Sequence, residues 1–169
     1  MKTNTNMEFI NTAISKDPDK ISTRSAWYDA ENTCIVSTNG HSLYMWNLTE
    51  GEISMYGLDL FSGVSPIILF PKENKIEKNL ADLGHFVNYT RVIPEYPEAS
   101  PKKELFFTKK TQVNFIRFCV VNQIIIDPLY LMPLTGKIWE YRLSPECTER
   151  KAALFLSGKL TSIIMPVLA

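Results

Sequence analysis

The stretch STRSAWYDAENTCIVSTNGHSLYMWNL, residues 22–48, decides the fold of this chain. Apolar and polar side chains alternate on both sides of the polar segment DAEN, which is typical of two strands joined by a turn. The second predicted strand carries Asn39-Gly40-His41 within its length. A glycine inside a strand often marks a point where another backbone approaches closely. The segment is therefore a candidate contact surface as well as a structural element.

The elements around this stretch indicate a strand-rich α+β protein. Helices are predicted at residues 6–18 and 70–84, because apolar residues there recur three and four positions apart. Further strands are expected within residues 51–63, 103–126, 137–143, 150–158 and 160–169, and a short helix or turn at 127–136. We expect an antiparallel sheet with two or three short helices packed on one face.

Composition narrows the classes of function. The chain has 169 residues, of which 45% are hydrophobic, so it can bury a substantial core. Lys and Arg number 18, as do Asp and Glu, so DNA or membrane binding would need a local charged patch. The apolar stretches are shorter than the ~20 residues that span a bilayer. Three dispersed cysteines argue against a disulfide scaffold, and we expect a cytoplasmic protein.

Catalytic motifs are absent from the sequence. His41 and Ser42 are neighbours, and neighbours on a strand point to opposite faces, so they do not form a dyad. Two histidines without clustered carboxylates give poor metal-ligand spacing, and neither a metal nor a cofactor is expected. We predict no enzymatic activity. A small hydrolase with a Cys–His or Ser–His site remains the alternative.

Two basic segments are candidates for nucleic-acid contact. Lys72, Lys75 and Lys78 recur every third residue of a predicted helix, and this spacing would place them on one side, over a phosphate backbone. Residues 102–118 mix lysines with aromatic residues, as a surface that stacks single-stranded bases would. For the second segment, a β-hairpin with a buried aromatic face is the preferred interpretation.

Three segments resemble the bacterial β sliding clamp family, the β subunit of DNA polymerase III. Residues 37–43, STNGHSL, are similar to the family's Ala-Thr-Asp-Gly-His-Arg-Leu, with Asn39 in place of Asp and Ser42 in place of Arg. Residues 86–94, FVNYTRVIP, are similar to Phe-Pro-Asp-Tyr-Arg-Arg-Val-Ile-Pro. Residues 162–169 are similar to the family's last strand, which ends in Met-Pro and a few more residues.

In that family the three segments form a hydrophobic pocket that captures short peptide motifs. Carried over position by position, the resemblance implies a pocket of Thr38, Gly40, His41, Leu43, Val87, Arg91, Val92, Met165, Pro166 and Val167. Glycine would let a peptide approach the backbone, and methionine would provide a deformable lining.

The resemblance implies a clamp-like protein that docks a short linear motif of a polymerase or another DNA replication or repair protein. Weak DNA contact through the three lysines and homo-oligomer formation are further expectations. A clamp chain carries three domains, so we expect residues 1–169 to form a single condensed unit. An internal boundary near residues 95–102 is the alternative, because this stretch is rich in proline. An orphan structural protein that kept the clamp fold also remains open.

Overall fold

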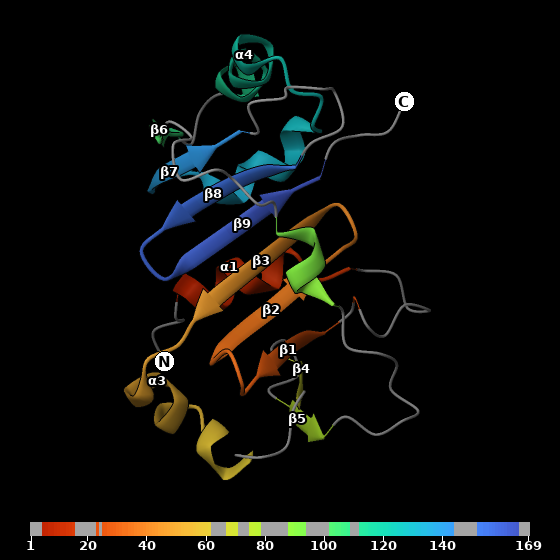
Figure 1. The fold of residues 1–169 in the computed structure, drawn as a ribbon, viewed down its shortest axis with the longest axis vertical. Helices are drawn as coiled ribbons and strands as arrows, with labels where there is room; N and C mark the ends of the chain where they lie inside the picture. The colour runs from red at the N-terminus through yellow and green to blue at the C-terminus, as the bar shows by residue number, and fades with distance from the viewer. Residues whose placement is uncertain are drawn as a thin grey trace. The chain divides into compact units, whose positions relative to one another are not determined.

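The computed structural model describes residues 5–15, 23, 25–61, 67–70, 75–78, 88–93, 102–108, 112–143 and 152–165. The chain divides into two compact units, Met1–Asn88 and Tyr89–Ala169. Both units contain antiparallel strands and a helix that packs on them (Figure 1). The predicted antiparallel α+β class is confirmed.

The first unit is built on an antiparallel sheet with the order β5-β4-β1-β2-β3. Its strands are β1 (Ala26–Asp29), β2 (Cys34–Thr38), β3 (Ser42–Asn47), β4 (Ile67–Phe70) and β5 (Lys75–Lys78). Trp27 lies opposite Val36, which in turn lies opposite Met45, so one apolar row crosses three strands. All residues of β1 and β2 are buried, which makes these strands the centre of the unit.

Helix α1 (Thr5–Thr12) covers one face of these strands and packs against β2 and β3. The ring of Phe9 stacks on that of Tyr44, with centroids 4.4 Å apart. The Ser37 hydroxyl donates a 2.6 Å hydrogen bond to the carbonyl of Ile10. The apolar side predicted for this helix is buried, so the prediction of an N-terminal helix is confirmed.

The strand predicted within residues 51–63 is wrong. The segment forms helix α3 (Glu50–Met55) and the 3₁₀ turn η1 (Leu58–Phe61). Thr49 accepts a hydrogen bond from the backbone N–H of Glu52, and the Glu52 carboxylate accepts one from the N–H of Thr49. This reciprocal capping box satisfies two N–H groups that a helix start otherwise leaves unpaired, and it favours a helix over a strand here.

The helix predicted at residues 70–84 is also wrong over its described part. Residues 75–78 form β5, which pairs antiparallel with β4, with Phe70 opposite Lys75 and Ile67 opposite Lys78. Hydrogen bonding to a neighbouring strand outweighs the helical spacing of the apolar residues, as tertiary context often does. The remainder of the predicted helix lies outside the described residues.

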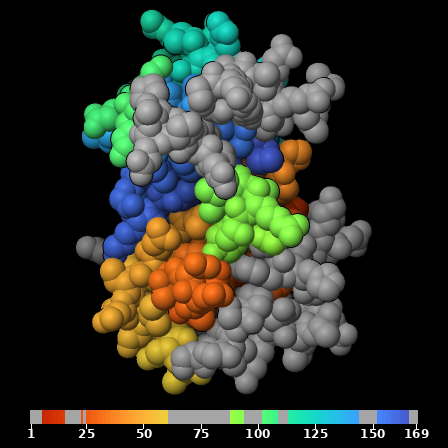
Figure 2. All heavy atoms as spheres, viewed as in Figure 1, coloured from red at the N-terminus to blue at the C-terminus, as the bar shows by residue number. Residues whose placement is uncertain are grey.

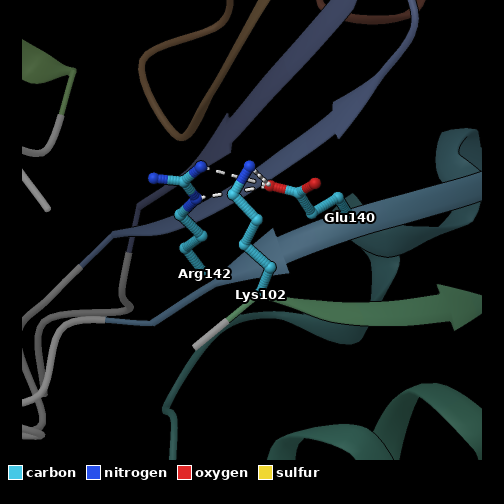
Figure 3. A network of polar contacts seen from close by, with 3 residues as sticks. All are labelled: Lys102, Glu140 and Arg142. Atoms are coloured by element: carbon cyan, nitrogen blue, oxygen red, sulfur yellow. Dashed lines mark hydrogen bonds and ion pairs between the residues drawn. The ribbon is translucent and has the colours of Figure 1, made fainter. Parts of the chain in front are cut away.

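The second unit has an antiparallel meander with the order β9-β8-β7-β6. Its strands are β6 (Lys103–Phe106), β7 (Ile138–Arg142), β8 (Ala153–Ser157) and β9 (Leu160–Ile164). The three strands predicted near the C-terminus are confirmed. Glu140 of β7 forms ion pairs with Arg142 on the same strand, at 3.3 Å, and with Lys102, which directly precedes β6, at 3.6 Å (Figure 3).

Residues 103–126 were predicted as strand, and the structure confirms this only for β6. Residues 112–122 of the segment form helix α4 (Gln112–Asn122) instead. Phe118 fixes this helix to the meander, because its ring lies 5.0 Å from that of Tyr141 and 5.8 Å from that of Phe155. The preferred β-hairpin interpretation of residues 102–118 is therefore wrong.

The short helix or turn predicted at residues 127–136 is confirmed as the 3₁₀ helix η4 (Pro128–Leu134). The Asp127 side chain caps its start by accepting from the backbone N–H of Leu129 at 2.9 Å. Leu131 and Leu134 are fully buried. The indole N–H of Trp139 donates to the carbonyl of Leu134 at 2.7 Å, which ties η4 to β7.

Candidate functional site

The Asn39-Gly40-His41 segment is a turn, and not the middle of a strand as predicted. β2 ends at Thr38 and β3 begins at Ser42, with Thr38 paired to Leu43. Gly40 has φ +91°, a backbone conformation that side-chain-bearing residues rarely adopt. The glycine therefore reverses the chain at this point, and the long second strand becomes a β2–β3 hairpin.

Side chains of the turn form hydrogen bonds to the turn's own backbone. The Asn39 carboxamide oxygen accepts from the N–H groups of His41 and Ser42, both at 2.9 Å. The Thr38 hydroxyl donates to the Ser42 carbonyl at 2.8 Å and accepts from the Gly40 N–H at 3.1 Å. Asn and Thr are suited to such local bonds because their short polar side chains reach the backbone two residues on. The turn is thus preorganised.

The candidate residues of the first unit fall into two pairs, one exposed to solvent and one buried. Gly40 and His41 are exposed at the tip of the turn. Thr38 and Leu43 are buried, with 8% and 4% of their surfaces exposed. A Cβ placed on Gly40 would meet no atom within 4 Å, so the space beside it is open. Contact with a ligand in this unit would therefore fall on Gly40 and His41, with Thr38 and Leu43 supporting them.

The other described candidates lie in the second unit. The 3₁₀ turn η3 (Tyr89–Val92) places Arg91 on the surface and leaves Val92 half-buried, while Tyr89 anchors the turn at 2% exposure. Met165 directly follows β9 and is half-buried. Val87, Pro166 and Val167 lie outside the described residues. A single pocket would combine residues of both units, and this stays a prediction.

The described hydroxyl and thiol groups that a hydrolase could use are hydrogen-bonded or buried. Ser42 is 2% exposed, and its hydroxyl donates to the Asn39 carboxamide oxygen at 3.2 Å. Cys34 and Cys119 are buried. Burial raises the pKa of the Cys119 thiol, which disfavours the nucleophilic thiolate. Cys147 lies outside the described residues.

The lysines predicted to contact DNA do not share a helix. Lys75 and Lys78 are the first and last residues of β5, and Lys72 lies outside the described residues. Positions three apart in a strand fall on opposite faces, so the helical argument for one basic side no longer applies. DNA contact by these lysines stays a prediction without that support.

The part of the chain that the structure describes contains no group of three or more His, Cys, Asp or Glu residues that could hold a metal ion. In the same residues, no helix has both the length and the apolar character needed to cross a membrane.

Sequence comparison finds no matching protein family and no matching curated protein. Structural comparison does find relatives. Over 98% of its length, the chain matches Caulobacter crescentus pol III beta with a TM-score of 0.61 and 14% identity. The fold is that of the bacterial β sliding clamp. The Thermotoga maritima DNA polymerase III β subunit gives 0.60 at 11% identity. The Helicobacter pylori β clamp, bound to a DNA ligase peptide, gives 0.55 at 15%.

The clamp resemblance read from the sequence is therefore confirmed at the level of the fold. The chain spans 63% of the length of each of these three clamp chains. Identities of 11–15% carry no residue roles with them. One contributor to the candidate site escaped the sequence analysis, namely Asn39 as the residue that organises the turn, although Asn-Gly is itself a strong turn signal.

Proposed function

We propose that this protein docks a short linear peptide of a DNA replication or repair partner and carries out no reaction on it. The clamp fold supports this proposal, as does the H. pylori clamp, whose structure holds a DNA ligase peptide. The observation that carries it is the β2–β3 turn, where Gly40 and His41 are exposed on a backbone fixed by Asn39 and Thr38. We further propose that the two units work together as one condensed clamp-like protein.

The candidate residues are suited to holding a peptide. Gly40 offers open space for a backbone, because nothing lies within 4 Å of its Cβ position. The half-buried Val92 and Met165 provide apolar surface, which stabilises a bound side chain by about 25 cal/mol per Å² removed from water. The exposed Arg91 could fix the direction of the peptide by binding a carboxylate or a carbonyl.

Replacing Met165 by glutamate tests the proposal. A fluorescein-labelled DNA ligase peptide, of the kind bound to the H. pylori clamp, is titrated against the protein and followed by anisotropy. Because few anchors carry most of the energy of such interfaces, losing one should cost about 2 kcal/mol or more, which is at least about 30-fold in Kd. Met165 is half-buried, so we expect the fold to survive, and circular dichroism checks this.

Met55→Glu is the matched control, since Met55 is a methionine exposed at 63% in α3. We expect this variant to bind the peptide as the wild type does. Equal affinity of the wild type and Met165→Glu would contradict the role of Met165. Failure of the wild type to bind any clamp-binding peptide would instead favour an orphan structural protein.

DNA contact through Lys72, Lys75 and Lys78 is a secondary part of the proposal. If these side chains neutralise phosphates, binding should be weak, independent of sequence and strongly weakened by salt. A duplex that does not bind at low salt would remove DNA contact from the function and leave peptide docking unaffected.

A further inference from the structure

The β2–β3 turn contains the only Asn-Gly pair in the sequence, Asn39-Gly40. The backbone nitrogen that follows an asparagine can attack the side-chain amide carbon and close a cyclic imide. Glycine favours this attack because it has no Cβ to crowd its nitrogen. Gly40 is exposed, and orange atoms of the segment that contains the turn lie at the molecular surface in Figure 2. The pair is therefore chemically labile and open to water.

The Asn39 side chain is held with its amide oxygen facing three donors. The backbone N–H groups of His41 and Ser42 donate to this oxygen, both at 2.9 Å, and the Ser42 hydroxyl donates to it at 3.2 Å. Two backbone N–H groups require an acceptor, so the orientation of the amide follows from its partners. An attack on the amide carbon develops negative charge on the same oxygen. Donors already aimed at that oxygen stabilise the charge, as in an oxyanion hole.

The same hydrogen bonds bring the two reacting atoms together. The bond from the His41 N–H closes a ring that passes through the Gly40 nitrogen, so the Asn39 side chain is folded back beside that nitrogen. Holding two reacting groups side by side removes much of the entropic cost of the reaction. The Gly40 N–H donates to the Thr38 hydroxyl at 3.1 Å, so an acceptor already faces the proton that the nitrogen must lose.

Asn32, in the β1–β2 turn, has the opposite bonding. Its amide nitrogen donates to the Asp29 carboxylate at 2.8 Å, and a negative charge at this position disfavours the charge that an attack would develop on the amide. The residue that follows is Thr33, whose β-branched side chain crowds its own nitrogen. The first unit thus contains two turn asparagines, of which only Asn39 is arranged for the reaction.

We propose that Asn39 is a self-modification site, where the turn converts its own asparagine through a cyclic imide. The Gly40 nitrogen forms a bond to the Asn39 Cγ and gives its proton to solvent. The bond from Cγ to the amide nitrogen breaks, and this nitrogen takes a proton from solvent and leaves as ammonia. Water then opens the imide at either carbonyl and gives aspartate or isoaspartate. Water is the only co-reactant, and nothing is oxidised or reduced.

The two products affect the turn differently. Aspartate keeps an oxygen in place for the N–H groups of His41 and Ser42. Isoaspartate adds a methylene to the main chain before Gly40, so the turn becomes too long to keep both these bonds and the pairing of Thr38 with Leu43. The consequence for docking rests on the proposed function: the isoaspartate form should bind the peptide at least about tenfold more weakly.

Peptide mapping by mass spectrometry tests the inference. The protein is incubated in mildly alkaline buffer, folded or in concentrated urea, and chromatography separates the asparagine, aspartate and isoaspartate forms of each peptide. Asn39 should convert at least about threefold faster in the folded protein than in urea, because only the folded turn supplies the three donors. Asn32 is the internal control and should remain an amide over the same period.

Ser42→Ala removes one of the three donors. Conversion of Asn39 should slow at least about threefold in the folded variant and stay unchanged in urea, where the donor is absent from both proteins. Circular dichroism checks that the variant folds, and if it does not, the comparison of folded and unfolded wild type decides alone. Slower conversion in the folded wild type than in urea would overturn the inference, and so would a folded Ser42→Ala variant that converts at the wild-type rate.

The mass measurement is independent of peptide binding. A wild type that binds no peptide would contradict the proposed function, while the conversion rates would still decide whether the turn modifies itself.

Discussion

Replacing Phe118 by alanine should destabilise the second unit severely. Phe118 is 6% exposed. Its ring contacts those of Tyr141, Phe107 and Phe155, with centroids 5.0, 5.7 and 5.8 Å away. Truncation of a buried phenylalanine typically costs about 3–5 kcal/mol. The separate contributions sum to about 3–7.5 kcal/mol, a range whose lower part agrees with this cost, since burial contributes about 1.5–3 kcal/mol and each of the three aromatic pairs about 0.5–1.5 kcal/mol more.

The assay is thermal unfolding followed by circular dichroism. At about 4–8 °C per kcal/mol for a unit of this size, the Tm of its transition should fall by more than about 12 °C. Val120→Ala, two residues away on the same helix, is the matched comparison. Val120 is 70% exposed, and alanine is the better helix former, so the free energy of unfolding should change by less than about 0.5 kcal/mol. A loss below about 1 kcal/mol for Phe118→Ala would refute the claim that this ring anchors α4.

Two further predictions concern the first unit. Thr49→Ala removes half of the α3 capping box and should lower the free energy of unfolding by about 1 kcal/mol, whereas Thr49→Ser should restore most of it; urea denaturation of both variants decides this. Burial raises the pKa of Tyr28, with added repulsion from Asp29, so the folded-state pKa lies above the unfolded value near 10.0. The stability that this difference provides is complete below pH 10 and is lost as pH rises from there through the folded pKa. Across that window, the free energy of unfolding of the wild type should therefore fall more steeply with pH than that of Tyr28→Phe. Parallel curves of stability against pH would contradict the raised pKa of Tyr28.

The elements that were predictable from sequence are those whose apolar pattern agrees with their surroundings. In the segment predicted as a helix over residues 6–18, α1 is observed over Thr5–Thr12, and it buries Phe9 and Ile10 as the spacing predicts; Ala13 and Ile14, which follow the helix, are buried as well. In β7, Trp139 and Tyr141 alternate with more exposed neighbours, and the strand is likewise observed. For these segments the local preference and the tertiary contacts point to the same structure.

α4 was missed because its outward face hides the helical period. The inward residues Phe115, Phe118 and Cys119 are spaced three and one apart, as on one side of a helix. Val113 and Val120 fill the opposite side, so the segment reads as continuously apolar and β-branched, which favours a strand. Sequence pattern alone cannot distinguish apolar residues that are exposed, such as Val113 and Val120, from apolar residues that are buried in the core.

The β5 segment shows the opposite error. Ile76 recurs with later leucines at helical intervals, yet residues 75–78 pair with β4. The strand is stabilised by pairing with β4, which is a contact that the local sequence of residues 75–78 does not reveal. The candidate site was partly predictable. Gly40 and His41 are exposed, as a contact surface requires, whereas Thr38 and Leu43 are buried, which the resemblance did not indicate.

The strand at the end of the second unit's meander also bears on solubility. An edge strand exposes unpaired backbone groups on which another chain can nucleate aggregation. β6 is only four residues long, and Glu104 faces Glu140 directly in the register. The two carboxylates would repel each other without the flanking Lys102 and Arg142, which hold Glu140. A strand arriving from another molecule would have to strip water from these charges, so we expect this edge to disfavour pairing with another chain.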